Sequence, residues 1–174
     1  MNCKDGTEQA LRQRQFRAAM GNYPTGVTVV ATRRADGGVV GLTINSFNSV
    51  SLQPLLVTWN LSNGSQWLQT FLRCTHYSVN VLADAQVALA RQFARRENQE
   101  VDATPWRVLP SGAPLLRGAV AHFECVNAQQ HGVGDHTLFV GRVHQFDHDA
   151  ERAPLLFHAG GYCSGQVLRA AQKL

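Results

Sequence analysis

The sequence contains little that would support a disulfide framework, a zinc site or a membrane anchor. Its cysteines are few and far apart, with no C-x-x-C pair and no zinc-ligand spacing. No segment approaches the roughly 20 apolar residues of a membrane helix, and the N-terminus lacks the apolar core of a signal peptide. We therefore expect a cytoplasmic protein without a membrane partner, whose four thiols stay reduced: Cys3, Cys74, Cys125 and Cys163.

Charge is also scarce. Charged residues make up 16% of the chain against 44% hydrophobic residues, a balance typical of globular proteins that leaves room for a buried subunit interface. The formal net charge is +4, but the basic residues are not interleaved with aromatic ones along a stripe, so we expect no nucleic-acid partner. The length of 174 residues fits a single domain spanning residues 1–174.

Several motifs of common enzyme classes are missing. There is no βαβ alternation and no G-x-G-x-x-G, which argues against a Rossmann domain. There is no G-x-S-x-G motif for acyl transfer. A group of His and Asp side chains resembles a metal cluster, but it straddles a strand end and a polar turn, so we expect no metal site there: His144, Asp147, His148 and Asp149.

Strand patterns dominate what is present. Alternating or apolar runs predict strands over residues 26–32, 39–43, 54–60, 76–82, 118–127, 136–146 and 154–158. Asp36-Gly37-Gly38 predicts a hairpin turn between the first two strands. The segment 128–135 is expected to be a loop between the two longest strands.

Three helices are expected at the margins of these strands. The first is capped by Thr7 and ends near Met20, the second is capped by Ser65, and the third is capped by Asp84. The third should present one inner face: Val87, Ala90, Phe93 and Ala94. Mostly antiparallel strands with three helices predict a mainly β protein with a closed or nearly closed barrel, since closure removes exposed sheet edges.

The segment 41–54 is the most informative for chemistry, because it concentrates short hydroxyl and amide side chains: Thr43, Asn45, Ser46, Asn48, Ser49 and Ser51. Such side chains, with backbone N–H groups, can cradle a phosphate without a P-loop. If the backbone is extended, Ser49 and Ser51 point to one side. A Ser/Asn-rich surface loop is the alternative interpretation.

Two further positions could bind a ligand. His136 follows Gly134-Asp135 at a loop-to-strand junction, where an imidazole could hydrogen-bond a carboxamide or a phosphate; a polar turn is the alternative. His158 and Tyr162 flank Gly160-Gly161, where a backbone can approach a flat ligand closely. A strand-ending turn with an aromatic plug is the other interpretation there.

Taken together in chain order, five segments resemble the short-chain flavin reductases of two-component flavin monooxygenases, members of the flavin reductase-like, FMN-binding split-barrel family. They are residues 16–32 (FRAAMGNYPTGVTVVAT), 41–54 (GLTINSFNSVSLQP), 78–94 (SVNVLADAQVALARQFA), 134–143 (GDHTLFVGRV) and 154–162 (PLLFHAGGY). The resemblance implies a six-stranded antiparallel Greek-key split barrel that forms a homodimer, with a flavin between the barrel rim and the partner subunit.

The resemblance also implies roles for individual residues. Thr25 and Gly26 would lie near the isoalloxazine, the segment 43–46 would contact the ring and ribityl chain, and the segment 49–51 would reach the phosphate. His136 would lie by the nicotinamide. The implied flavin-binding residues are Thr25, Gly26, Thr43, Ile44, Asn45, Ser46, Ser49, Val50, Ser51, Leu82, Ala83, Gln86 and Phe93, and the implied nicotinamide-binding residues are His136, His158 and Tyr162.

The function implied is hydride transfer from NADH or NADPH to FMN or FAD, which supplies reduced flavin to a partner monooxygenase. The chemistry belongs to the cofactors, so no catalytic side chain is expected. The residues leave open which flavin and which nicotinamide are used. They also leave two alternatives: a tightly bound FMN that reduces iron, cobalt or another acceptor, and a flavin-binding module without enzymatic activity.

Overall fold

The structure is a computed structural model that describes residues 3–95 and 106–166. It is mainly β with three α-helices, as predicted: α1 (Cys3–Met20), α2 (Leu68–Arg73) and α3 (Val87–Ala94), the last preceded by a 3-10 turn, η1 (Asp84–Gln86). None of the described helices is both long and apolar enough to cross a membrane.

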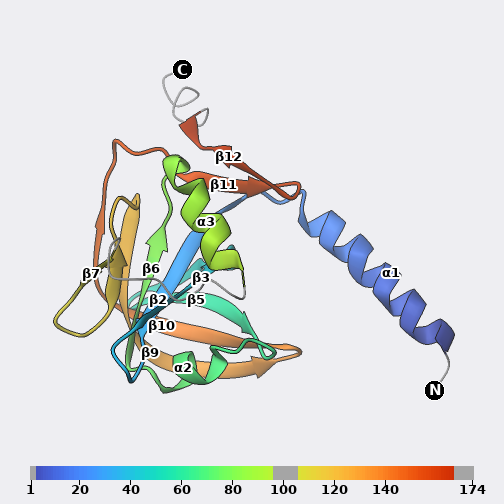
Figure 1. Cartoon of the computed structure of the whole chain (residues 1–174), viewed down its shortest axis with the longest axis horizontal. Helices are drawn as coiled ribbons and strands as arrows, with labels where there is room; N and C mark the ends of the chain where they lie inside the picture. The colour runs from blue at the N-terminus through green and yellow to red at the C-terminus, as the bar shows by residue number, and fades with distance from the viewer. Residues whose placement is uncertain (1–2, 96–105, 167–174) are drawn as a thin grey trace.

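Seven antiparallel strands form one strongly curved sheet, in the order β3-β2-β6-β9-β10-β5-β4 (Figure 1). Its strands are β2 (Thr28–Arg33), β3 (Val39–Ile44), β4 (Asn48–Leu52), β5 (Leu55–Ser62), β6 (His76–Val81), β9 (Ala121–Val133) and β10 (His136–His148). The sheet therefore has seven strands where six were expected. Within the described chain, its two edge strands, β3 and β4, do not pair with each other.

Strand β2 is buried on both faces because it separates two hydrophobic cores. Val30 faces a core inside the curved sheet, where the rings of Trp59 and Phe139 stack with centroids 4.4 Å apart. Val29 faces a second core outside it, against Phe93 of α3. The consecutive buried apolar residues 29–31 reflect this double burial. Helix α3 is thereby held against the outer face of the sheet.

The two longest strands extend further than predicted. Residues 128–133, expected in a loop, belong to β9, which pairs with β10 up to a two-residue turn at Gly134-Asp135. Gly134 has a φ of 60°, a conformation that glycine adopts without strain. The polar residues at the end of β9 are exposed because this part of the hairpin extends beyond the core, so polarity there indicated solvent exposure and not a loop.

The three predicted helix caps and one inner-face position are wrong. Helix α2 begins at Leu68 with Trp67 as its N-cap, and Ser65 Oγ instead accepts a hydrogen bond of 3.2 Å from the Trp67 N–H before the helix. Helix α1 begins at Cys3, so Thr7 lies inside it. Asp84 belongs to η1, and its carboxylate accepts a hydrogen bond of 2.6 Å from the Ser164 hydroxyl, a partner distant in sequence. Ala94 is exposed at the end of α3, whereas Ala90 and Phe93 are buried as predicted.

Two hairpins complete the fold. Strand β11 (Leu155–His158) confirms the last predicted strand, and it pairs with β12 (Gly161–Ser164) and with the short β1 (Thr25–Gly26). Strands β7 (Trp106–Val108) and β8 (Pro114–Leu116) form a hairpin that the sequence patterns did not indicate, since each strand has only three residues.

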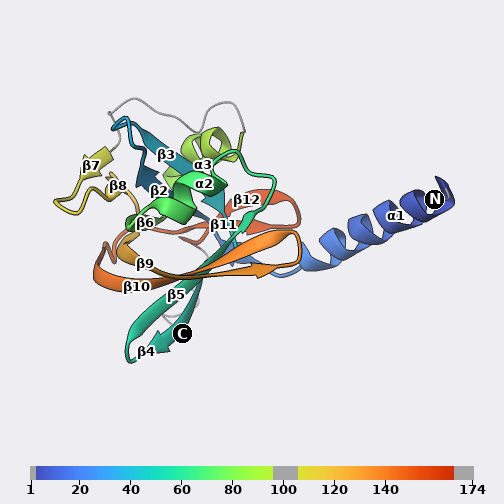
Figure 2. The same cartoon turned by 90° about the horizontal axis from the view of Figure 1, so that it is seen from below.

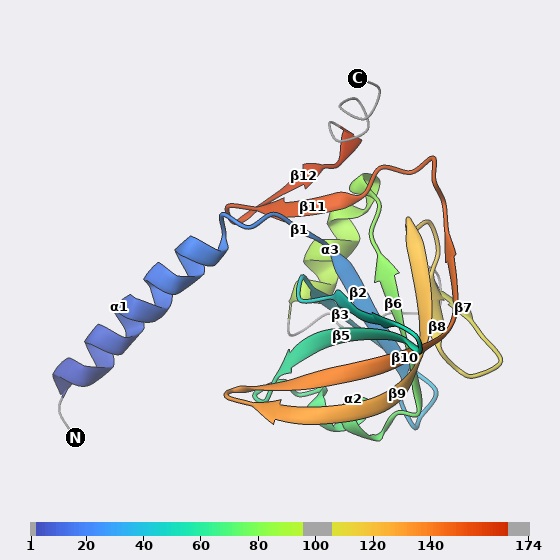
Figure 3. The same ribbon diagram turned by 180° about the vertical axis from the view of Figure 1, so that it is seen from behind.

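Helix α1 projects away from the sheet (Figures 1 and 3). Its residues from Gly6 to Met20 are all exposed, and Leu11, Phe16 and Met20 expose 56%, 67% and 52% of their surface. The β4–β5 hairpin also extends outward (Figure 2), and Leu52 near its tip is 86% exposed.

Candidate functional site

A pocket of about 580 Å³ lies on the outside of the curved sheet, between the end of α1 and the β3–β4 segment. It brings together four of the residues predicted to bind flavin: Thr25, Gly26, Asn45 and Ser46. The volume falls in the range typical of small-molecule sites. Asn48, one of the side chains expected to cradle a phosphate, also lines it. The other lining residues were not predicted to bind a ligand: Arg17, Met20, Gly21, Tyr23, Pro24, Phe47, Asn60 and Phe157.

One wall of this pocket is polar and held in place by the sheet. The Asn60 backbone N–H donates a hydrogen bond of 3.0 Å to Ser46 Oγ, which attaches the 45–48 segment to β5. Thr25 Oγ1 is buried and has no hydrogen-bond partner among the described residues. A buried hydroxyl without a partner is costly, so a ligand that hydrogen-bonds Thr25 would remove this penalty. These neutral donors and acceptors suit the polar edge of a flavin.

The opposite wall is formed by segments distant in sequence. Phe157 pairs with Thr25 across β11 and β1 and packs its ring 5.5 Å from that of Tyr162. The Ala159 N–H donates a hydrogen bond of 2.8 Å to the Gly21 carbonyl, which joins the β11–β12 turn to the end of α1. Ala159 has a φ of 48°, a strained backbone conformation for a residue other than glycine. His158 precedes it and is exposed, so His158 and Tyr162 lie on the hairpin that borders the pocket.

A smaller neighbouring pocket, of about 230 Å³, holds three more predicted residues, Thr43, Ile44 and Phe93. It adjoins the first pocket along the chain, since Ile44 and Asn45 are consecutive. The Thr43 hydroxyl donates a hydrogen bond of 2.8 Å to the Ala90 carbonyl and so joins β3 to α3.

Ser49, Val50 and Ser51 lie on β4, beyond the residues that line the pocket. A β-bulge shifts the register here, with Ser49 opposite Val57 and Ser51 opposite Leu56. Since Val57 and Leu56 are adjacent and point to opposite faces, the two hydroxyls face opposite sides of the sheet. The prediction that they point to one side is therefore wrong, because the bulge interrupts the alternation on which it depended.

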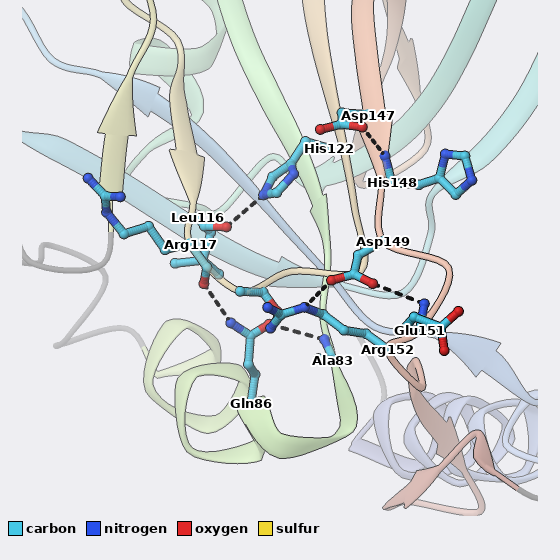
Figure 4. Close-up of polar contacts among 11 residues, drawn as sticks. Ala83, Gln86, Leu116, Arg117, His122, Asp147, His148, Asp149, Glu151 and Arg152 are labelled. Atoms are coloured by element: carbon cyan, nitrogen blue, oxygen red, sulfur yellow. Dashed lines mark hydrogen bonds and ion pairs between the residues drawn. The ribbon is translucent and has the colours of Figure 1, made fainter.

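The residues predicted at the start of the third helix make contacts within the protein (Figure 4). Leu82 and Ala83 are buried. The Gln86 side chain accepts a hydrogen bond of 3.0 Å from the Ala83 N–H and donates one of 2.9 Å to the Arg117 carbonyl. An anion bound at this turn would need the Ala83 N–H as a donor. That N–H already donates to the Gln86 side chain. None of the three residues lines the two pockets described above.

His136 stands at the start of β10, opposite Ser62. The register places His136 on the same outer face as Asn60, which lines the larger pocket, because side chains two positions apart on a strand share a face. Its Nδ1 lies 2.7 Å from the Asp135 carboxylate, and this hydrogen bond and charge lower the pKa of Asp135. The Asn63 side chain holds the turn, because its Oδ1 accepts a hydrogen bond of 2.8 Å from the Thr137 hydroxyl.

Arg17, in the last turn of α1, was not predicted to be a site residue. It lines the larger pocket, and its positive charge also contributes, less than His136 does, to the lowered pKa of Asp135. The pocket and the Gly134-Asp135-His136 turn are therefore electrostatically connected. Figure 3 shows the β9–β10 hairpin extending toward the side from which α1 projects. Sequence patterns alone could not find Arg17, since one arginine in a basic helix has no distinguishing spacing.

Other parts of the described chain do not enlarge this site. A pocket of about 450 Å³ contains Arg33, Arg34 and Arg73, but it lies at the opposite end of β2 and holds none of the predicted residues. No group of three or more His, Cys, Asp or Glu side chains within residues 3–95 and 106–166 could hold a metal ion. His148 and Asp149, from the apparent cluster noted above, lie in the exposed end of β10 and the turn after it.

Comparisons with known proteins agree with this arrangement. Residues 20–166 match the family model described as a flavin reductase like domain. The chain is 40% identical over 149 residues to the NADH-dependent FMN reductase SmoA of Agrobacterium fabrum, covering 86% of this chain and 84% of that protein. It is 35% identical over 154 residues to the reductase subunit HsaB of a flavin-dependent monooxygenase from Rhodococcus jostii, covering 88% and 78%.

A solved structure is also similar to this chain. An NADH:FAD oxidoreductase of Streptomyces globisporus, in complex with NAD and FAD fragments, superimposes with a TM-score of 0.81 at 37% identity. The match covers 87% of this chain and 91% of that one.

Proposed function

The chain belongs to the flavin reductase-like family, and we propose on that basis that it is an NAD(P)H-dependent flavin reductase that supplies reduced FMN or FAD to a partner monooxygenase. The observation that carries this proposal is the pocket that gathers Thr25, Gly26, Asn45 and Ser46. Its lining has hydrogen-bonding groups and aromatic surface, which suit a flavin, and the reaction needs no protein nucleophile.

Bound flavin would accept a hydride from the reduced nicotinamide, and the protein's part is to bind and orient both. Ser46 and Asn45 hold the polar wall in a fixed position against β5. Thr25 offers a hydroxyl that has no hydrogen-bond partner among residues 3–95 and 106–166. The proposed flavin site extends over Thr43, Ile44 and Phe93 in the neighbouring pocket. It also includes residues of β4 and of the turn before α3 that do not line either pocket: Ser49, Val50, Ser51, Leu82, Ala83 and Gln86.

The proposed nicotinamide site comprises His136, with His158 and Tyr162 on the opposite hairpin. Because the Asp135 carboxylate holds His136 Nδ1, the imidazole is kept in one orientation, with Nε2 free to contact a carboxamide or phosphate. We expect His136→Gln to raise KM for the nicotinamide about tenfold with little change in flavin affinity. Weaker flavin binding at an unchanged nicotinamide KM would contradict this role.

We further propose that the protein works as a homodimer. The exposed apolar side chains of α1 and of the β4–β5 tip, including Phe16 and Leu52, are the surface that a second copy would cover. Most of the stability of a helix in a protein comes from tertiary packing, and the side chains of α1 from Gly6 to Met20 are all exposed, so α1 gains most from such packing. Sedimentation equilibrium of the full chain tests this: a monomer at micromolar concentration would contradict it.

The remaining parts of the proposal concern architecture and location. The curved sheet would correspond to the family's six-stranded Greek-key split barrel, with β4 as an additional edge strand. A cytoplasmic location is supported by three described cysteines that are free thiols, Cys74, Cys125 and Cys163.

The decisive experiment is the oxidation of NADH and NADPH by the purified protein with and without added FMN or FAD. Turnover that rises and saturates with added flavin supports a reductase that uses flavin as a substrate. Turnover on iron or cobalt acceptors by a flavin that survives gel filtration would favour a tightly bound cofactor. Flavin binding without oxidation of either nicotinamide would exclude the enzyme.

A further inference from the structure

A further pocket, of about 270 Å³, lies between the β7–β8 hairpin, the start of β9 and the end of β10. It shares no lining residue with the two pockets of the proposed flavin site, and Figure 1 shows β7 on the side of the sheet away from α1. Its volume is slightly below the range of sites for drug-sized ligands, so it suits a smaller group. Two carboxylates, Glu124 and Asp147, and one guanidinium, Arg107, line it. With His122 neutral, the lining therefore carries a net negative charge.

Glu124 is the buried member of this pocket. The residue is only 4% exposed, and within residues 3–95 and 106–166 its carboxylate makes no hydrogen bond or ion pair. Ser78 lies directly opposite it on β6 but cannot donate to it, because the Ser78 hydroxyl donates to the Pro114 carbonyl. A buried carboxylate without a donor is costly. Glu124 therefore lacks a partner that only a group entering the pocket from outside this part of the chain would supply.

The other polar groups of the lining also include acceptors. His122 shares a face of β9 with Glu124, two positions away. Its Nε2 lies 2.7 Å from the Leu116 carbonyl oxygen (Figure 4). A carbonyl oxygen only accepts, so Nε2 carries a proton, and the neutral ring then leaves Nδ1 as an acceptor. Asp147 lies directly opposite His122 on β10 and adds a second carboxylate. This arrangement favours a ligand that donates hydrogen bonds and carries a positive charge.

The remaining walls suit a short alkyl chain. Leu109 and Leu115 supply apolar surface beside the polar groups, as the alkyl stem of an amphipathic cation requires. Arg107 lines the same pocket without forming an ion pair with Glu124, and it is exposed. Its guanidinium is therefore hydrated, and it acts on an incoming cation as a like charge near the surface, where such interactions are weak.

We propose that this pocket binds a protonated primary amine, whose ammonium group donates to the Glu124 carboxylate while its alkyl chain packs against Leu109 and Leu115. An ammonium group has three N–H donors and no acceptor, which matches a lining rich in acceptors. The amine belongs either to a small free molecule or to a lysine side chain of a docked protein, because both present the same group. The site is independent of flavin binding.

The test is a titration of the full-length protein with n-butylammonium chloride at constant ionic strength, followed by NMR of the backbone amides. We expect saturable shifts in β9 around Glu124, with a dissociation constant on the order of a millimolar. The neutral isostere 1-butanol should give none. Glu124→Gln should weaken binding at least about tenfold, because it removes the charge and keeps the shape. Glu8→Gln, which removes an exposed carboxylate of α1, is the matched control and should change nothing.

Arg107→Gln is a second variant, at an exposed position that folding does not depend on. It should tighten binding about two- to threefold by removing a like charge. Loss of binding in Arg107→Gln would mean that the pocket holds an anionic group, and would overturn the proposal. So would equal binding by Glu124→Gln, or no saturable binding of n-butylammonium by the unaltered protein.

A capped lysine, N-acetyl-lysine methylamide, distinguishes the two sources of the amine. Binding as tight as that of n-butylammonium, or tighter, would support a lysine side chain of a docked protein, since the flanking amides are then accommodated. Weaker binding of the capped lysine would support a small free amine. Both results support an ammonium site at Glu124.

Discussion

The inner and outer faces of the β5–β10 pair differ in what their side chains do. On the inner face, Trp59 and Phe139 lie directly opposite each other, fully buried and stacked with an interplanar angle of 11°. On the outer face, the exposed Asn60 lines the pocket and the half-buried His136 is paired with Asp135. Because side chains alternate along a strand, the same two strands stabilise the sheet on one side and present the groups proposed to bind ligands on the other.

This division means that substitutions on the two faces should have separable effects. Changes to the inner face should lower the free energy of unfolding, whereas changes to the outer face should alter ligand binding or titration at nearly constant stability.

Phe139→Ala should lower the free energy of unfolding by about 3–5 kcal/mol, because it removes a stacked ring and leaves a cavity beside Trp59. Urea denaturation followed by tryptophan fluorescence measures this loss. Arg142→Ala, an exposed position on the same strand, is the control and should change stability by less than about 0.5 kcal/mol. Similar losses for the two variants would contradict the difference between the faces.

Gly141→Ala should lower stability by about 1–3 kcal/mol, since a Cβ at this position would overlap the hydroxyl of Tyr77 in the inner core. Tyr77→Phe removes the atom that obstructs the new methyl group, so the double variant should recover part of the loss. A double-mutant cycle of thermal or urea unfolding measures the coupling. Gly132→Ala, where a Cβ meets nothing within 4 Å, is the matched control.

Ser46→Ala should raise the dissociation constant of FMN about fivefold, because the Ser46 hydroxyl holds the polar wall of the pocket to the Asn60 N–H. Quenching of flavin fluorescence measures the affinity. Ser111→Ala is the matched control. It removes a hydroxyl that accepts a hydrogen bond of 3.2 Å from the Ala113 N–H, in the separate pocket that contains Arg33, Arg34 and Arg73. Flavin affinity that falls equally in both variants would show that the effect is not local.

His136→Gln should raise the pKa of Asp135 toward its ordinary value of 3.8, because the His136 hydrogen bond and charge are the main causes that lower it. The pKa of Asp135 is lower in the folded protein than in the unfolded chain. The pairing with His136 therefore stabilises the fold at every pH above the pKa of the unfolded carboxyl group. It is lost as the pH falls through the folded pKa. NMR titration of the carboxyl groups measures the change. Asp149, whose pKa is lowered by Arg152, should not shift; an unchanged Asp135 would contradict the pairing.

Much of the fold was predictable because it depends on local patterns. The alternation in residues 136–146 identified β10, and the apolar run before Arg33 identified β2. The cap at Thr7 was wrong because α1 already begins at Cys3. The cap at Asp84 was wrong because Asp84 lies within η1 and binds Ser164, which is 80 positions away. The end of β9 was missed because an exposed paired strand has the same polarity as a loop.

The sequence by itself determined the mainly β class, the buried strands and the polar segment that forms one wall of the pocket. Each of these depends on neighbours along the chain, which periodicity and composition record. Only the tertiary structure decided that Arg17, Asn60 and Phe157 meet Thr25 and Ser46 in one pocket, and that Ser49 and Ser51 face opposite sides. Those relations come from strand pairing, a bulge and a helix end joined to a distant hairpin, and no spacing in the sequence encodes them.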